Sequence, residues 1–75
     1  MTEEKKERQL RELGLTIAYY RKLKGMTQSQ LAEALGFSRT HISNIEAPNI
    51  KTSLSLDSLL DIAEALDIPV RDLFD

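Results

Sequence analysis

The sequence contains no cysteine and no tryptophan, and only two tyrosines, two phenylalanines, two prolines and three glycines among its 75 residues. The absence of cysteine excludes disulfide bonds and thiolate metal sites, and it is compatible with a reducing compartment. No segment approaches the roughly 20 apolar residues of a membrane span. The charged N-terminus also lacks the apolar run of a signal peptide. We therefore expect a cytoplasmic protein without a membrane partner.

The length predicts one small domain that comprises residues 1–75. A chain of this size is close to the limit at which a single core suffices without disulfides or metal, so a partner subunit would help to stabilise it. The sequence contains no strand signal, no internal repeat and no low-complexity tract. We expect an all-α fold.

The charge balance is unusual for a protein that binds nucleic acid. The formal net charge is −2, whereas nonspecific affinity for DNA comes mostly from lysine and arginine. The charges are unevenly distributed along the sequence, which makes DNA binding less unfavourable than the total suggests. Residues 1–25 carry seven basic and four acidic side chains, whereas residues 47–75 carry two basic and six acidic ones. If the acidic end faces away from DNA, affinity can depend on a few well-placed contacts.

Two short helices joined by a tight turn are predicted between Met26 and Glu46, a segment that reads MTQSQLAEALGFSRTHISNIE. Thr27 and Gln30 have the spacing of a capping box, and Ser38 can cap a second helix. Gly36 suits the left-handed residue that ends the first helix, which we predict at 28–35. Apolar residues at helical spacing predict one shared core face, formed by Leu31, Leu35, Ile42 and Ile45. This arrangement predicts a helix-turn-helix.

The long N-terminal segment is predicted to form a helix from Thr2, as its cap, to Lys24, with Gly25 as its stop. One side of this helix forms a core stripe of Leu10, Leu13, Ile17 and Tyr20. A second apolar stripe consists of Leu15, Tyr19 and Leu23. This second stripe has two interpretations, either contact with the C-terminal segment of the same chain or a dimer contact.

The C-terminal third begins with a predicted loop over 47–54, which contains Pro48 and several small polar residues. A fourth helix is predicted from Ser55 to about Leu66, with Leu54 and Leu59 closing over its start. Pro69 suits the first turn of a short final helix, VRDLF. We therefore expect five helices in total.

The chain resembles the phage-repressor (XRE) type of helix-turn-helix domain from Leu13 to Phe74. The matching positions are Gly25, Thr27, Gln28, Leu31, Ala32, Gly36, Ser38, Ile42, Ser43, Ile45 and Glu46, then SLDSLLDIAEAL at 55–66 and DLF at 72–74. The resemblance implies a five-helix, lambda-repressor-like domain that binds operator DNA as a homodimer and regulates transcription. It is strongest toward the controller proteins of restriction–modification systems, because the chain ends without a second domain and carries SRTHIS.

The resemblance also implies roles for individual residues. Side chains of the second helix of the motif would face base edges, namely Arg39, Thr40, His41 and Asn44, with Arg39 suited to guanine and Asn44 to adenine. Phosphate contacts would come from Thr27, Gln28, Ser43, Asn49, Lys51 and Thr52. Arg21 and Glu46 would form a structural ion pair. The loop over 47–54 departs from the family, because it is longer and lacks a glycine and a basic pair.

The dimer contact is predicted at the end of the fourth helix and in the fifth, with an apolar centre of Ile68, Val70, Leu73 and Phe74. We expect no enzyme, because the carboxylates are scattered and no nucleophile is paired with a base. His41 is the only histidine and no cysteine can join it, so we expect no metal. We also expect no other cofactor and no small-molecule ligand. The alternative function is a protein-interaction module, an antitoxin or anti-repressor partner without operator binding.

Overall fold

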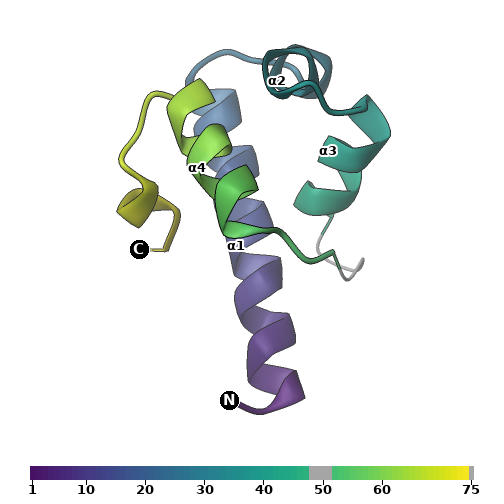
Figure 1. The fold of residues 1–75 in the computed structure, drawn as a ribbon, viewed down its shortest axis with the longest axis vertical. Coiled ribbons are helices and arrows are strands. Elements are labelled where there is room, and N and C mark those ends of the chain that lie inside the picture. The colour runs from purple at the N-terminus through teal and green to yellow at the C-terminus, as the bar shows by residue number, and fades with distance from the viewer. Residues whose placement is uncertain (48–51, 75) are drawn as a thin grey trace.

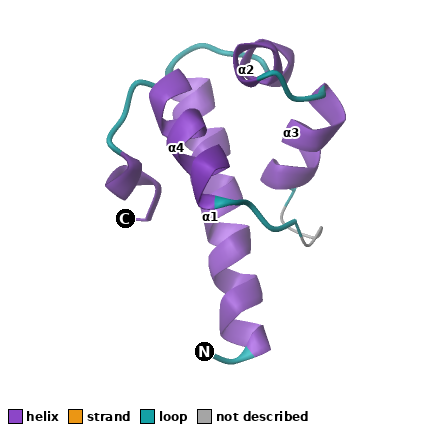
Figure 2. Cartoon of the chain, in the orientation of Figure 1, coloured by secondary structure: helices purple, strands orange, loops and turns teal. Residues whose placement is uncertain are grey.

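The computed structural model of the chain describes residues 1–47 and 52–74. Four α-helices lie in this part of the chain, and they are α1 (Glu3–Leu23), α2 (Gln28–Leu35), α3 (Arg39–Glu46) and α4 (Leu56–Ala65). One 3₁₀-helix, η1 (Val70–Phe74), follows them, and the described residues contain no strand (Figure 2). The all-α prediction is confirmed. None of the described helices is long and apolar enough to span a membrane.

The expected count of five helices is wrong, because the described residues form four α-helices and the last segment is a 3₁₀-helix. The last segment, η1, is a 3₁₀-helix of five residues, in which the Asp72 amide donates to the Pro69 carbonyl oxygen at 3.0 Å. So short a segment after a proline gains too few i→i−4 bonds to stabilise an α-helix, and the tighter hydrogen bonding of a 3₁₀ turn replaces it.

Helix starts follow the chemistry of the residues before them. Thr27 Oγ1 accepts from the Gln30 amide at 3.0 Å, and the Gln30 side chain accepts from the Thr27 amide at 2.8 Å, which completes the capping box. Ser38 caps α3 by accepting from the His41 amide at 3.0 Å. Gly36 ends α2 with φ of 71°, in the left-handed region that glycine adopts without steric cost.

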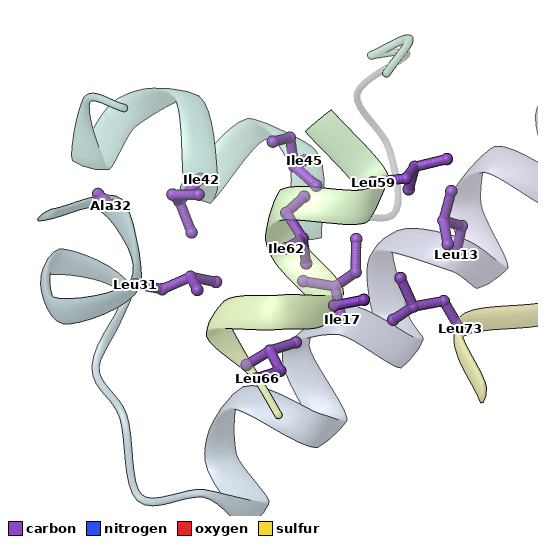
Figure 3. Close-up of a cluster of buried hydrophobic side chains, with 11 residues drawn as sticks. Leu13, Ile17, Leu31, Ala32, Ile42, Ile45, Leu59, Ile62, Leu66 and Leu73 are labelled. Carbon is purple, nitrogen blue, oxygen red and sulfur yellow. The ribbon is translucent and has the colours of Figure 1, made fainter. Parts of the chain in front are cut away.

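The core lies where the four α-helices and η1 meet (Figure 3). Each element contributes fully buried side chains, which include Ile17 of α1, Leu31 of α2 and Ile42 of α3. The rest of the core consists of Leu13, Ala32, Ile45, Leu59, Ile62, Ala63, Leu66 and Leu73. Burial of these apolar side chains is the main stabilising contribution, at about 1.5–3 kcal/mol for each large one.

In Figure 1, α1 runs the length of the molecule and its N-terminal half projects beyond the other elements. Helices α2 and α3 lie on one side of the α1–α4 pair and η1 lies on the other. The second apolar stripe of α1 remains largely uncovered, since Leu15, Tyr19 and Leu23 are 48%, 60% and 62% exposed. Packing within the chain therefore does not cover this stripe.

Candidate nucleic-acid interface

Helix α3 has one apolar face and one polar face. Ile42 and Ile45 lie on the inner face and belong to the core. The outer face begins at Arg39 and Thr40, which are exposed, and continues with the half-buried His41, Ser43 and Asn44. These outer side chains include the donor and acceptor types that read base edges in a major groove. The polar set predicted from the sequence is thus gathered on one side of one helix.

An ion pair joins the end of α3 to α1. Arg21 Nε and Nη2 donate to the two carboxylate oxygens of Glu46 at 2.7 and 2.9 Å. Both side chains are buried. Arg21 Nη1 also donates to the Met26 carbonyl oxygen at 2.7 Å, so the guanidinium links the turn before α2 to the same carboxylate. A bidentate pair of this kind restricts both the position and the rotation of the last turn of α3.

Gln28, the first residue of α2, contacts this ion pair. Its Nε2 donates to Glu46 Oε1 at 3.0 Å, an interaction that no pattern in the sequence predicts. The amide has a second N–H and an oxygen, which this bond does not use. The Glu46 carboxylate therefore holds Gln28 in place at the N-terminus of α2, beside the Thr27 cap.

His41 packs against Phe37, the residue just before the Ser38 cap. The two ring centroids are 4.9 Å apart with an interplanar angle of 65°, an edge-to-face arrangement. The imidazole is thus fixed by an aromatic neighbour at the start of α3. The sequence gave no indication of this ring contact, because the spacing of apolar residues does not define the rotamer of a polar one.

The candidate phosphate contacts lie in different surroundings. Thr52 is half-buried, and its hydroxyl donates to the Asn44 carbonyl oxygen at 3.4 Å, which connects the returning loop to the last turn of α3. Ser43 is half-buried on α3 itself. Asn49 and Lys51 lie outside the described residues.

The candidate dimer residues are divided between the core and the surface. Leu73 is 2% exposed and belongs to the core of its own chain, whereas Phe74 is 64% exposed. Ile68 and Val70 are half-buried and pack against the core. Phe74 borders a groove of about 660 Å³ between α1, η1 and the start of α4, where Leu10, Leu15 and Leu54 also line the wall.

No group of three histidine, aspartate or glutamate side chains among residues 1–47 and 52–74 could hold a metal ion. The carboxylate of Glu46 is occupied by Arg21 and Gln28. The chemistry that the α3 face offers is hydrogen bonding and charge pairing by exposed polar side chains.

These features define a helix-turn-helix, in which α2 and α3 are joined by the turn at Gly36. The helix-turn-helix family model matches residues 17–73. The chain belongs to the XRE-type helix-turn-helix family, as its resemblance to phage-repressor domains predicted.

Curated relatives with similar sequences are transcriptional regulators. The chain is 38% identical over 63 residues to the HTH-type transcriptional regulator SinR of Bacillus subtilis, covering 84% of this chain and 56% of SinR. It is 35% identical over 63 residues to the regulator SlrR of the same organism, covering 41% of that protein. The chain thus spans about half the length of these relatives. Their names describe regulators rather than enzymes, which fits the expectation of a non-enzyme.

Solved structures agree with the fold. The restriction–modification controller protein C.AhdI from Aeromonas hydrophila superimposes with a TM-score of 0.79 and 34% identity, covering 87% of this chain and 96% of that one. SinR in a crystal structure with DNA superimposes with a TM-score of 0.75 and 38% identity, covering 84% and 98%. Both are similar to this chain over nearly their whole resolved length.

Proposed function

We propose that this chain is a sequence-specific DNA-binding transcription regulator that inserts α3 into a major groove. The main support is the division of α3 into an inner face that is fixed by packing and an outer face that is not covered by the core. Core packing and the Arg21–Glu46 pair hold the inner face, so the outer polar side chains are presented on a rigid support. Rigid presentation favours specific contacts, because little side-chain or backbone ordering remains to oppose binding.

The proposed base contacts are Arg39, Thr40, His41 and Asn44. Arg39 stands in the first turn of α3 and is exposed, and recognition helices contact bases mostly through their N-terminal residues. Its guanidinium suits bidentate binding to guanine, and the Asn44 amide suits adenine. The complex of SinR with DNA supports a duplex as the partner of this fold.

The proposed phosphate contacts begin at the N-terminus of α2. Thr27 and Gln28 stand at the N-terminus of α2, where the helix dipole favours an anion, and the second N–H of Gln28 is not used by the Glu46 bond. Ser43, Thr52, Asn49 and Lys51 complete the proposed set. With few basic residues near the motif, these contacts would orient the domain, and base contacts would supply much of the discrimination.

The proposed assembly is a homodimer on a palindromic operator, with half-sites one helical turn, roughly 34 Å, apart. Its contact region is the end of α4 and η1, and η1 lies across the α1–α4 pair from α3 in Figure 1. A partner there leaves α3 accessible. Within the proposed interface Phe74 is exposed, Ile68 and Val70 are half-buried against the core, and Leu73 belongs to the core itself. The likeness to C.AhdI supports a controller-type regulator.

The alternative is a protein-interaction module with the same fold. The exposed stripe of Leu15, Tyr19 and Leu23 on α1 favours a protein partner, as does the net charge of −2. The outer face of α3 opposes this function for the helix-turn-helix itself, because a protein-binding face usually contains a central apolar anchor.

Selection of bound duplexes from a random library at near-physiological salt, followed by sequencing, tests the proposal. An enriched palindrome with half-sites about one turn apart is the expected result. A folded protein that enriches no motif would point instead to the interaction module.

A further inference from the structure

The last turn of α3 lies directly against the backbone of α1 at Gly14. Gly14 is buried, and a Cβ atom at this position would overlap the carbonyl oxygen of Ile45. The same Cβ would lie 3.2 Å from the carbonyl carbon of Ile45 and 3.5 Å from the Cα of Glu46. All three neighbours are backbone atoms, so no side-chain rotation can make room for a methyl group.

The backbone conformation does not require glycine at residue 14. The two glycines with positive φ are Gly25 and Gly36, whereas Gly14 lies inside the 21-residue helix α1. In a helix interior glycine is less favourable than alanine by about 1 kcal/mol. The reason for glycine here is therefore the close approach of the two helices, which outweighs a helix propensity that favours alanine.

Two contacts on the same side of α1 hold the end of α3. Arg21 follows Gly14 by seven residues, about two helical turns, and binds Glu46, the residue after Ile45. The other end of α3 is fixed separately, by the turn at Gly36 and by the fully buried Ile42. The distance between the α1 and α3 backbones at Gly14 thus sets the angle of α3 relative to α2.

We propose that Gly14 is a positioning residue for base recognition. By lacking a side chain, it allows α3 to dock at the depth at which its outer face and the N-terminus of α2 engage one duplex together. This inference rests on the proposed DNA-binding function. A methyl group at residue 14 would move the last turn of α3 away from α1 and tilt the helix about its N-terminal end. Asn44, next to Ile45, would be displaced more than Arg39.

The first test is the sign of the stability change in Gly14→Ala. Helix propensity alone predicts a higher melting temperature, whereas overlap with the α3 backbone predicts a melting temperature lower by at least about 5 °C. The matched control is Ala34→Gly, the reverse exchange at an exposed position of α2. The control should lower the melting temperature by a few degrees, about what helix propensity accounts for. A higher melting temperature for Gly14→Ala would overturn the proposal.

The second test is the ratio of affinities for the selected duplex and for a scrambled duplex, measured by fluorescence anisotropy on folded protein. Gly14→Ala should reduce this ratio about tenfold by misaligning base contacts, while Ala34→Gly should leave it unchanged. An unchanged ratio in folded Gly14→Ala would reject a positioning role. Nonspecific binding depends on phosphate contacts and should change little.

If the Gly14→Ala protein does not fold, Asp67→Gly is added both to it and to the protein with Gly14, and the affinity ratios of these two proteins are compared. Asp67 has φ of 56°, and glycine relieves that strain far from α3. A double variant that remains unfolded would mean that Gly14 acts on folding only, which also overturns the proposal. Absence of duplex binding by the unmodified protein would reject the proposed function instead, since the melting temperatures do not depend on DNA.

Discussion

The carboxylate of Glu46 accepts three N–H groups, two from Arg21 and one from Gln28. These donors belong to α1 and α2, so one buried side chain joins three helices. Among the described residues, no buried side-chain nitrogen or oxygen lacks a hydrogen-bond partner. A buried carboxylate is tolerated under these conditions because the charge is paired and its lone pairs are satisfied.

Replacing Glu46 with glutamine should destabilise the domain strongly. Glu46→Gln leaves the Arg21 guanidinium buried without its counter-charge, at a cost of about 3–5 kcal/mol. This cost is comparable to the whole stability of a small domain, so urea unfolding should show a largely or fully unfolded protein. Glu33→Gln removes an exposed carboxylate of α2 and serves as the control. Equal midpoints for the two variants would mean that the pair adds nothing measurable.

The sequence predicts which side chains are available for the site but not how these side chains lie relative to one another. Arg21 and Glu46 are separated by 25 residues, and only the family resemblance suggested that they pair. The contact between Gln28 and Glu46 and the fit of Gly14 against Ile45 have no signature in spacing, because each joins two elements. A glycine inside a long helix was the one available hint for Gly14.

At the element scale, local side-chain chemistry determines where each helix begins. The four α-helices start after Thr2, Thr27, Ser38 and Ser55, and each of these side chains accepts from a backbone amide. The start of each helix was therefore predictable, since the cap and the residue it bonds are three apart in sequence. The 3₁₀ form of η1 was not, because apolar spacing alone does not distinguish it from one α-helical turn.

Removal of the α2 cap should weaken the domain by an amount typical of helix caps. Thr27→Ala loses the bond to the Gln30 amide and half of the capping box, and the free energy of unfolding should fall by about 1 kcal/mol. Ser29→Ala, within the first turn of α2, is the matched hydroxyl deletion on an exposed residue. Chemical denaturation measures both, and a Thr27→Ala loss no larger than that of Ser29→Ala would contradict the role of the cap.

For the whole molecule, the arrangement of the elements separates two surfaces. Helix α3 and η1 lie on opposite sides of the α1–α4 pair (Figure 1), and the acidic residues are concentrated after residue 46. Residues 1–46, which include α2 and α3, carry eight basic and six acidic side chains, so the part of the chain that contains the motif is less acidic than the net charge suggests. The fold class followed from the sequence, whereas the burial of Leu73 required the packed structure, because apolar spacing does not say which partner covers a residue.

Dimerisation through η1 predicts that Phe74→Asp yields a folded monomer. Phe74 is 64% exposed, so aspartate costs the subunit little, but in an interface it would bury an unpaired charge. Sedimentation equilibrium measures the mass, and circular dichroism checks folding.

Leu73→Asp is unsuitable because Leu73 lies in the core, where the charge would unfold the subunit. The charge-matched control is Leu56→Asp, at an exposed position of α4. A Phe74→Asp dimer as stable as the unmodified protein would place the interface elsewhere.

Base reading by α3 is tested by repeating the duplex selection with Arg39→Ala. We expect the motif of the unmodified protein with one position per half-site relaxed, and an affinity for the original operator weaker by about 1–3 kcal/mol. Arg8→Ala removes the same charge from an exposed position of α1 and should select the unmodified motif. An Arg39→Ala protein that selects an unchanged motif, with equally reduced affinity for every sequence, would contradict base reading by this residue.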